Sequence, residues 1–183
     1  MTLIQEQIET IIDVTPEERA ARLTEAGTAW NERIAADPGT AGLTYKVTGR
    51  GIGAVATEIR AGKHRFLVDE PAGLAGDDLA ASPVEYALGA LVSCQVVVFR
   101  LYAQALGLTI DEIEITAEGD LDVRKLFGID ESGRAGFHDV RVAVAITGPD
   151  TEQQYENLRQ VVDAHCPVLD LFANPVPTSG VLV

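Results

Sequence analysis

Cysteine is scarce in this chain of 183 residues, which contains only Cys94 and Cys166. A small secreted domain held together by disulfides would use more cysteines in a shorter chain, so that class is excluded. Neither cysteine belongs to a CxxC pair, and the chain has no HExxH motif and no histidine pair at helical spacing. We therefore expect neither a bound metal nor another cofactor.

Positive charge is also in short supply, because 14 Lys and Arg residues stand against 28 Asp and Glu residues, a net charge of −14. Such a surface repels phosphate backbones and anionic lipids, so we expect neither nucleic acid nor a membrane as a partner. Residues 1–14 contain glutamates and no basic region followed by an apolar run, unlike a signal peptide. The sequence predicts a cytoplasmic location.

The most hydrophobic stretch, Ser82–Gly107, has an uncharged run from Tyr86 to Phe99, shorter than the ~20 apolar residues that a bilayer requires. Between those two residues the only polar side chains are Ser93, Cys94 and Gln95. A helix that is apolar on nearly every side needs cover on nearly every side. We therefore predict a central core helix that is partly covered by something other than its own fold.

The ends of this helix are well marked. Ser82 is a good N-cap, Pro83 suits the first helical position, and Glu85 completes a capping box. Gly107 suits the left-handed position just after the last turn. The helix is thus predicted to fill the whole stretch between these signals.

Residues 1–41 predict an N-terminal helical extension. A second helix start lies at Thr15–Glu18, with cap, proline and box glutamate in the expected order, and Asp37–Gly39 ends the helix. Trp30 lies on its apolar stripe and is expected to pack rather than to bind a ligand. An earlier apolar stripe consists of Ile4, Ile8, Ile11 and Ile12.

From Leu43 the period of the apolar residues changes to two, which indicates strands. We predict a first strand over Leu43–Thr48, a turn over Gly49–Gly53, and further strands over Val55–Arg60 and His64–Val68. The Gly-, Pro- and Asp-rich segment Asp69–Ala81 then forms a loop that leads to the central helix. Together these strands make an antiparallel meander.

Two longer alternating segments follow the central helix, over residues 113–123 and 140–146, each with one apolar and one polar face. A helix is predicted over Thr151–His165, then a short helix over Val168–Ala173, and an edge strand over Val176–Val183. The fold class is therefore α+β, with an antiparallel sheet covered by helices on one side. Residues 42–183 form one domain in this interpretation.

The two thiols have different surroundings. Cys166 precedes Pro167, and if it caps the short helix, the helix amides favour its thiolate. Cys94 lies in the middle of an apolar helix, where a thiolate is disfavoured, so a reactive Cys94 needs a cation from elsewhere. Because a buried cysteine is most often an inert small hydrophobe, the residues alone leave both a redox and a structural role open.

The segments HRFLVDEP and SPVEYALGALVSCQVVVFRLYAQALGL, followed about 70 residues later by CPV, resemble the OsmC/Ohr family of osmotically induced and organic hydroperoxide resistance proteins. The resemblance covers residues 43–183, and its most specific parts are the P-x-E helix start, Cys94 and Cys166–Val168. The helical extension lies outside the shared core. The segment DEPAGLAGDD resembles a less characterised OsmC-like branch of the family.

The resemblance implies an OsmC-like fold, an intertwined homodimer and two active sites at the subunit interface. It implies a thiol-dependent peroxidase in which Cys94 reduces an organic hydroperoxide and becomes a sulfenic acid. Cys166 would resolve this acid by forming a disulfide, which an external dithiol then reduces. An organic substrate is also favoured by the apolar residues Phe66, Leu91, Val97 and Val98.

The resemblance further implies that a glutamate and an arginine support the thiolate. Glu85 matches the glutamate by motif, but the capping box alone also explains it, and nine helical steps place it on the opposite side of the helix from Cys94. If Glu85 acts on Cys94, either the start of the helix is irregular or the glutamate that acts belongs to the partner subunit. Arg65 matches the arginine, with Arg60 as the substitute.

Other interpretations remain. The chain could be a dimeric stress-response or small-ligand-binding protein whose cysteines are not catalytic. A cysteine hydrolase is less supported, because no histidine is placed as a base for Cys94. His165 could tune Cys166 but also suits a satisfied histidine at a helix end, and Arg100 is expected to be structural.

Overall fold

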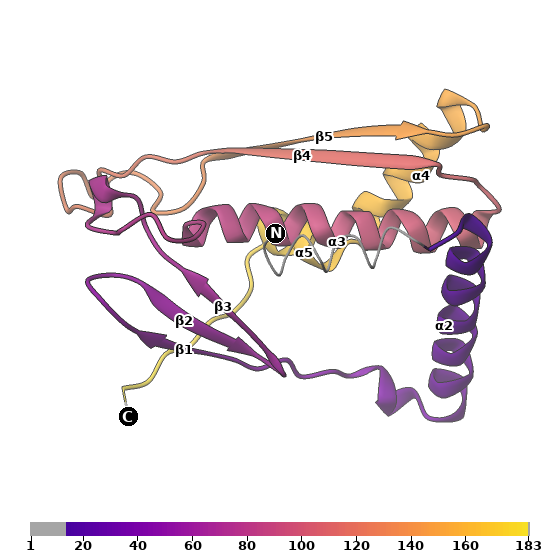
Figure 1. Ribbon diagram of the computed structural model, residues 1–183, viewed down its shortest axis with the longest axis horizontal. Helices are drawn as coiled ribbons and strands as arrows, with labels where there is room; N and C mark the ends of the chain where they lie inside the picture. Colours follow the sequence, from indigo (N-terminus) through magenta and orange to yellow (C-terminus); the bar gives the residue numbers. More distant parts are fainter. Residues whose placement is uncertain (1–13, 183) are drawn as a thin grey trace. The chain divides into compact units, whose positions relative to one another are not determined.

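The computed structural model describes residues 14–182, and the chain forms two compact units (Figure 1). Within the described range, the first unit contains residues 14–42, 97–113 and 146–165, and the second contains the rest. The structure is α+β, with two small antiparallel sheets and several helices. The predicted division at residues 41 and 42 does not coincide with these two units, and it stays a prediction.

Helix α3 (Pro83–Leu106) is the longest element and confirms the predicted central helix. The Glu85 carboxylate accepts hydrogen bonds from the Ser82 amide at 2.7 Å and the Ser82 hydroxyl at 2.6 Å, while the Glu85 amide donates to Ser82 Oγ at 3.4 Å. Gly107 has a φ of +70°, as a left-handed residue after a helix requires. The capping signals therefore gave both ends correctly.

One side of α3 is apolar and exposed. We refer to it as the exposed stripe, and its members follow each other at spacings of three or four residues: Tyr86, Ala90, Ser93, Val97 and Leu101. Val97 is 57% exposed although it lies in the middle of the helix. Helix α3 is the one helix in residues 14–182 that is long and apolar enough to cross a membrane. Core helices of soluble proteins can have the same length and composition. The chain's own fold leaves this side uncovered, as expected, and its cover from outside the chain stays a prediction.

The predicted meander is present as a three-stranded antiparallel sheet of β1 (Val47–Gly51), β2 (Thr57–Ala61) and β3 (His64–Val68). The third strand is as predicted, whereas the first was placed too early. Gly49 belongs to β1 and pairs with Ile59, so the predicted turn at Gly49–Gly53 was wrong. Glycine suits this position because a Cβ there would lie 3.1–3.2 Å from the side chains of Thr57 and Ile59.

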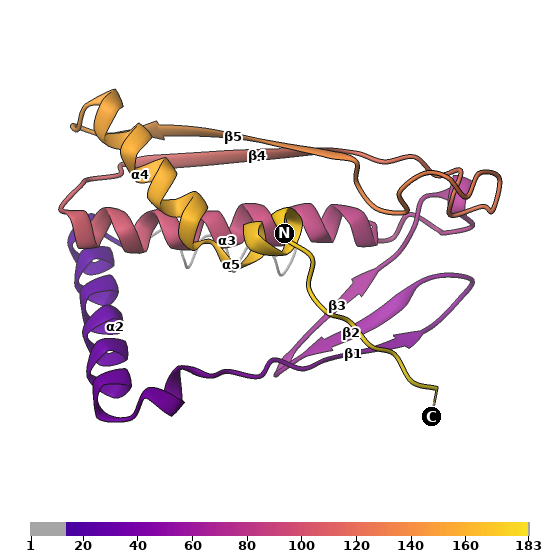
Figure 2. The same ribbon diagram turned by 180° about the vertical axis from the view of Figure 1, so that it is seen from behind.

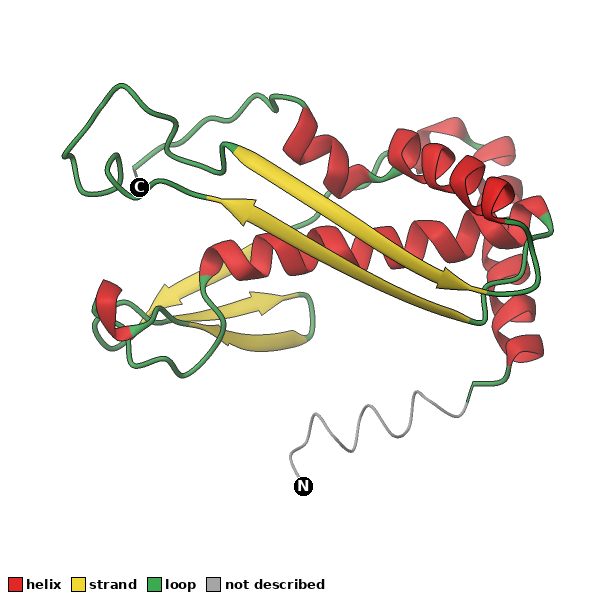
Figure 3. Cartoon of the chain, turned by 90° about the horizontal axis from the view of Figure 1, so that it is seen from above, coloured by secondary structure: helices red, strands yellow, loops and turns green. Residues whose placement is uncertain are grey.

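Strands β4 (Glu112–Asp120) and β5 (Asp139–Thr147) form the second sheet and lie side by side in Figure 3. Hydrogen bonds flank the pair at both ends, from Asp111 to Thr147 at 2.9 Å and from His138 to Asp120 at 2.9 Å. These partners are antiparallel. The residues of both strands alternate strictly between exposed and half-buried, which confirms the predicted polar face.

In the first unit, α2 (Pro16–Ala36) begins with the predicted capping box at Thr15 and is followed by the short helix η1 (Pro38–Ala41). The stripe of four isoleucines predicted for residues 1–12 lies outside the described residues. Helix α4 (Glu152–His165) buries Leu158 and Val162.

The last helix of the chain, α5 (Pro167–Ala173), follows α4 directly (Figure 2). The predicted break at Cys166 is therefore confirmed. Residues 175–182 form no strand, so the predicted edge strand was wrong over its described part. Pro177 lacks an amide hydrogen and limits strand pairing there. Before α3, the loop contains one short helix, η2 (Ala72–Leu74), and is otherwise irregular as predicted.

Candidate functional site

The two cysteines, which are 72 positions apart in sequence, come together in the second unit. Cys94 lies on α3 and is half-buried, Cys166 is the N-cap of α5 and is 2% exposed, and both thiols are free. After burial, the proximity of the Cys94 side chain is a further cause that raises the pKa of the Cys166 thiol, so the two thiols lie close together. The structure thus brings together the two residues that the sequence singled out.

The pKa of Cys166 is raised, and burial is the main cause because it disfavours the charged thiolate. The amides of Leu169 and Val168, at the start of α5, act in the opposite direction and lower this pKa. The thiol makes no cap hydrogen bond of standard geometry. The predicted help from the helix amides is therefore present, but burial outweighs it and keeps Cys166 protonated at neutral pH.

We expect the two cysteines to alkylate at clearly different rates. With a raised pKa and almost no exposure, Cys166 should react with iodoacetamide more slowly than the half-buried Cys94, and its reaction should accelerate as the pH rises above neutral. Mass spectrometry of peptides after timed alkylation measures both rates. In urea the two rates should converge, and equal rates in the folded protein would contradict the difference in burial.

Glu85 is exposed and bonded to Ser82, and these bonds hold the pKa of its carboxyl below the ordinary value. Within residues 14–182, no hydrogen bond or ion pair links Glu85 to either cysteine. Its role as a helix cap is therefore visible in this chain. A role toward a thiol stays a prediction.

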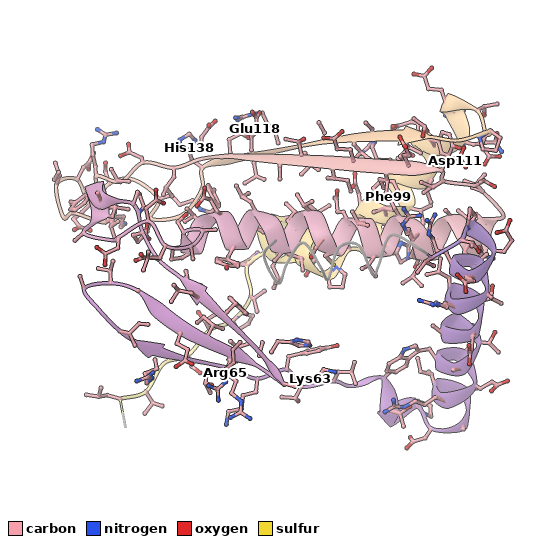
Figure 4. The ribbon with its side chains drawn as sticks, viewed as in Figure 1. Lys63, Arg65, Phe99, Asp111, Glu118 and His138 are labelled. Carbon is pink, nitrogen blue, oxygen red and sulfur yellow. The ribbon has the colours of Figure 1, made fainter. Side chains whose placement is uncertain are left out.

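Arg65 lies on the sheet of β1–β3 and forms an ion pair with Glu58 at 3.3 Å (Figure 4). Its neighbour Phe66, on the other face of the sheet, contacts Tyr86 of α3 with 5.2 Å between the ring centroids. Because successive side chains of a strand point to opposite faces, Arg65 is on the face away from this contact. Arg60 shares that face, as the register shows. Among the described residues, neither arginine has a hydrogen bond or ion pair to a cysteine.

In the first unit, His165 and Arg100 have other partners. The Nδ1 atom of His165 lies 2.7 Å from the Val161 carbonyl oxygen, and its ring lies 4.8 Å from that of Tyr102. This is the satisfied histidine at a helix end that the sequence left as one option. The pKa of Arg100 is lowered, first by burial and then by the charge of Arg19.

No role was predicted for Gln95, which is 1% exposed on α3 next to Cys94. Its side-chain oxygen is buried and has no hydrogen-bond partner among the described groups. Such orphaned acceptors are rare in folded proteins. A polar residue at i+4 from the fully buried Leu91 was the available signal.

No group of three or more potential metal ligands occurs in the described part of the chain.

Residues 76–179, more than half of the chain, match the family described as OsmC-like protein. The chain therefore belongs to the OsmC-like family, which includes organic hydroperoxide resistance proteins, and it is a distant member. The family resemblance seen in the sequence is confirmed.

Solved structures have the same fold. An OsmC-like protein from Mycoplasma pneumoniae has a TM-score of 0.63 at 17% identity and covers 72% of this chain and 88% of its own. An organic hydroperoxide resistance protein OsmC from Legionella pneumophila has a TM-score of 0.56 at 19% identity and covers 71% and 89%. An OsmC-like protein of unknown function from Vibrio cholerae has a TM-score of 0.51 at 16% identity and covers 70% and 91%. No curated protein matches the chain.

Proposed function

We propose that this protein is a thiol-dependent peroxidase that reduces organic hydroperoxides. The observation that carries the proposal is the meeting of Cys94 and Cys166, two thiols distant in sequence that interact in one unit. Membership of a family that includes hydroperoxide resistance proteins supports the same reaction. A cytoplasmic setting and an external dithiol as reductant are parts of this proposal.

The reaction proceeds in three steps. The Cys94 thiolate attacks the terminal oxygen of the hydroperoxide, so the O–O bond breaks, the alcohol leaves with a proton, and Cys94 becomes a sulfenic acid. The Cys166 sulfur then attacks the Cys94 sulfur and releases water, which forms the disulfide. An external dithiol finally reduces this disulfide by exchange and is itself oxidised.

The contrast in burial supports this division of roles. A peroxide has to reach the first sulfur, and Cys94 is the more exposed of the two. Cys166 is buried and its pKa is raised, which suits a thiol that waits for an intramolecular partner. Apolar surroundings of Cys94 on α3 favour an organic hydroperoxide over hydrogen peroxide. Faster reduction of hydrogen peroxide than of cumene hydroperoxide would contradict this preference.

We further propose that the active form is a homodimer. Cys94 borders the exposed stripe of α3, because Ala90 and Val97 are its neighbours at i−4 and i+3. A second copy that covers this stripe would also desolvate the site. It could bring the guanidinium and the glutamate that the thiolate requires, roles for which Arg65, Arg60 and Glu85 are the candidates.

Thiol counting tests the proposed function. The reduced protein is treated with one equivalent of cumene hydroperoxide, and free thiols are counted before and after. The peroxidase predicts the loss of both thiols and a Cys94–Cys166 disulfide within one chain, seen by non-reducing mass spectrometry. Unchanged thiol counts would reject it and favour the second candidate, a dimeric binding or stress-response protein. The deep burial of Cys166 is the observation that favours this alternative.

A further inference from the structure

The positive charge of this acidic chain is concentrated in one sheet. Residues 46–68, which include β1–β3, contain five of the 14 Lys and Arg residues but only one of the 28 Asp and Glu residues, Glu58. The segment therefore carries a net charge of +4 in a chain whose total is −14. A local concentration of positive charge on an otherwise acidic protein attracts anions.

The strand register places three arginines on one face of this sheet. Arg60 of β2 lies directly opposite Arg65 of β3, and Arg50 of β1 lies directly opposite Glu58. We refer to this set as the arginine face: Arg50, Glu58, Arg60 and Arg65. Two like charges directly across from each other destabilise a sheet. The Arg60–Arg65 pair therefore destabilises the fold, and a bound anion would reduce this repulsion.

Glu58, the only carboxylate among residues 46–68, is already engaged. Glu58 accepts hydrogen bonds from Arg50 at 2.9 and 3.3 Å and from Arg65 at 3.3 Å. These contacts, first that of Arg50, hold the pKa of Glu58 below its ordinary value. The guanidinium of Arg60 donates through Nε to the Gly62 carbonyl oxygen at 3.4 Å, and within residues 14–182 no carboxylate forms an ion pair with it.

A hollow of about 230 Å³ lies between the three arginines. Within one chain it lies on the side of the sheet away from the contact between Phe66 and Tyr86, so it is separate from that chain's own thiol site, whereas the role proposed above for Arg65 or Arg60 concerns the thiolate of a partner copy. The arginines that line it come from three different strands, and hydrogen bonds through Glu58 hold two of them in place.

We propose that the arginine face is a binding site for a small oxyanion, either a phosphate or the carboxylate of an organic acid. Arg60 and Arg65 donate hydrogen bonds to its oxygens from the guanidinium N–H groups that are not engaged in the contacts given above. Guanidinium groups match the geometry of both kinds of anion. Glu58 positions Arg50 and Arg65 and lowers the net charge of the site. The strongly acidic remainder of the chain excludes long polyanions.

Calorimetric titration at low ionic strength tests the site, with inorganic phosphate and succinate as separate probes. We expect saturable binding of at least one of them to the full-length protein. Because hydrogen bonds to charged groups are worth ~1.5–3 kcal/mol, Arg60→Gln should weaken this binding by about tenfold or more. The matched control Lys63→Gln, which removes one positive charge at the turn of the same hairpin, should bind the probe like the wild type.

Two results would overturn the proposal: no saturable binding of either probe, or an equal loss of affinity in Arg60→Gln and Lys63→Gln, which would indicate general charge only. Folding is checked by thermal denaturation, and Arg60→Gln should be at least as stable as the wild type because it removes a like-charge pair. The titration measures binding and not turnover, so its outcome is independent of whether Cys94 reacts with peroxides.

Discussion

Replacement of Cys94 by serine is expected to lower the rate of organic hydroperoxide reduction by roughly a thousandfold or more. A serine hydroxyl cannot take the place of a thiolate in attack on the peroxide oxygen, and loss of the nucleophile removes the reaction as a unit. The measurement is peroxide consumption with a dithiol as reductant. Activity within about tenfold of the wild type would show that another group performs the chemistry.

Cys166→Ser is the matched variant and has a different expected result. The first turnover should proceed at a near-normal rate, because Cys94 is intact, but the sulfenic acid should then persist. Trapping with dimedone and mass spectrometry would detect this species on Cys94. If the two variants behaved alike in the first turnover, the proposed division of roles between the cysteines would be wrong.

Phe99→Ala is expected to have the largest effect on stability. Phe99, labelled on α3 in Figure 4, is fully buried and belongs to the largest buried side chains. Removing a buried aromatic ring costs about 3–5 kcal/mol of unfolding free energy. Urea denaturation of the variant and the wild type at the same protein concentration measures this cost, because any self-association then acts at equal concentration in both.

Ser93→Ala provides the control on the same helix. Ser93 is exposed, and its hydroxyl makes only a long 3.4 Å bond to the Ala90 carbonyl oxygen. Its replacement should change the unfolding free energy by less than about 0.5 kcal/mol. A small effect of Phe99→Ala would mean that the ring is less well packed than its burial indicates.

The helices were the most predictable elements because their ends depend on local chemistry. Ser82, Glu85 and Gly107 bound α3, and Thr15 begins α2, in each case through groups within four residues of one another. The long strands β4 and β5 were also predictable, since their strict alternation reflects one polar face.

The errors fell where the pattern carries no information. Gly49 and Gly51 lie inside β1 but have no side chain to contribute to an alternating pattern, so they looked like a turn. The tail after α5 has apolar residues that suit a strand, yet residues 175–182 form none. Strand formation there depends on a partner edge, which the local sequence does not contain.

The site was predictable in part. Family resemblance paired Cys94 with Cys166, whereas their meeting in space depends on the fold of the second unit and cannot be derived from spacing. The face on which Arg65 lies followed only from the register with Arg60 and from the contact of Phe66. Gln95 was missed because a single polar residue in an apolar helix does not reveal whether it has a partner.

Cys166 is the single residue between the end of α4 and the start of α5, which has seven residues. Cys94, by contrast, lies within α3 and has hydrogen-bonded helical turns on both sides. We therefore expect a disulfide between them to displace the backbone at the start of α5 more than the backbone of α3. Hydrogen exchange of the amides in residues 167–173 should then differ between the reduced and oxidised protein, while those around Cys94 stay equally protected. Hydrogen exchange in this short helix would then report the fraction of molecules in which the disulfide has formed and has not yet been reduced.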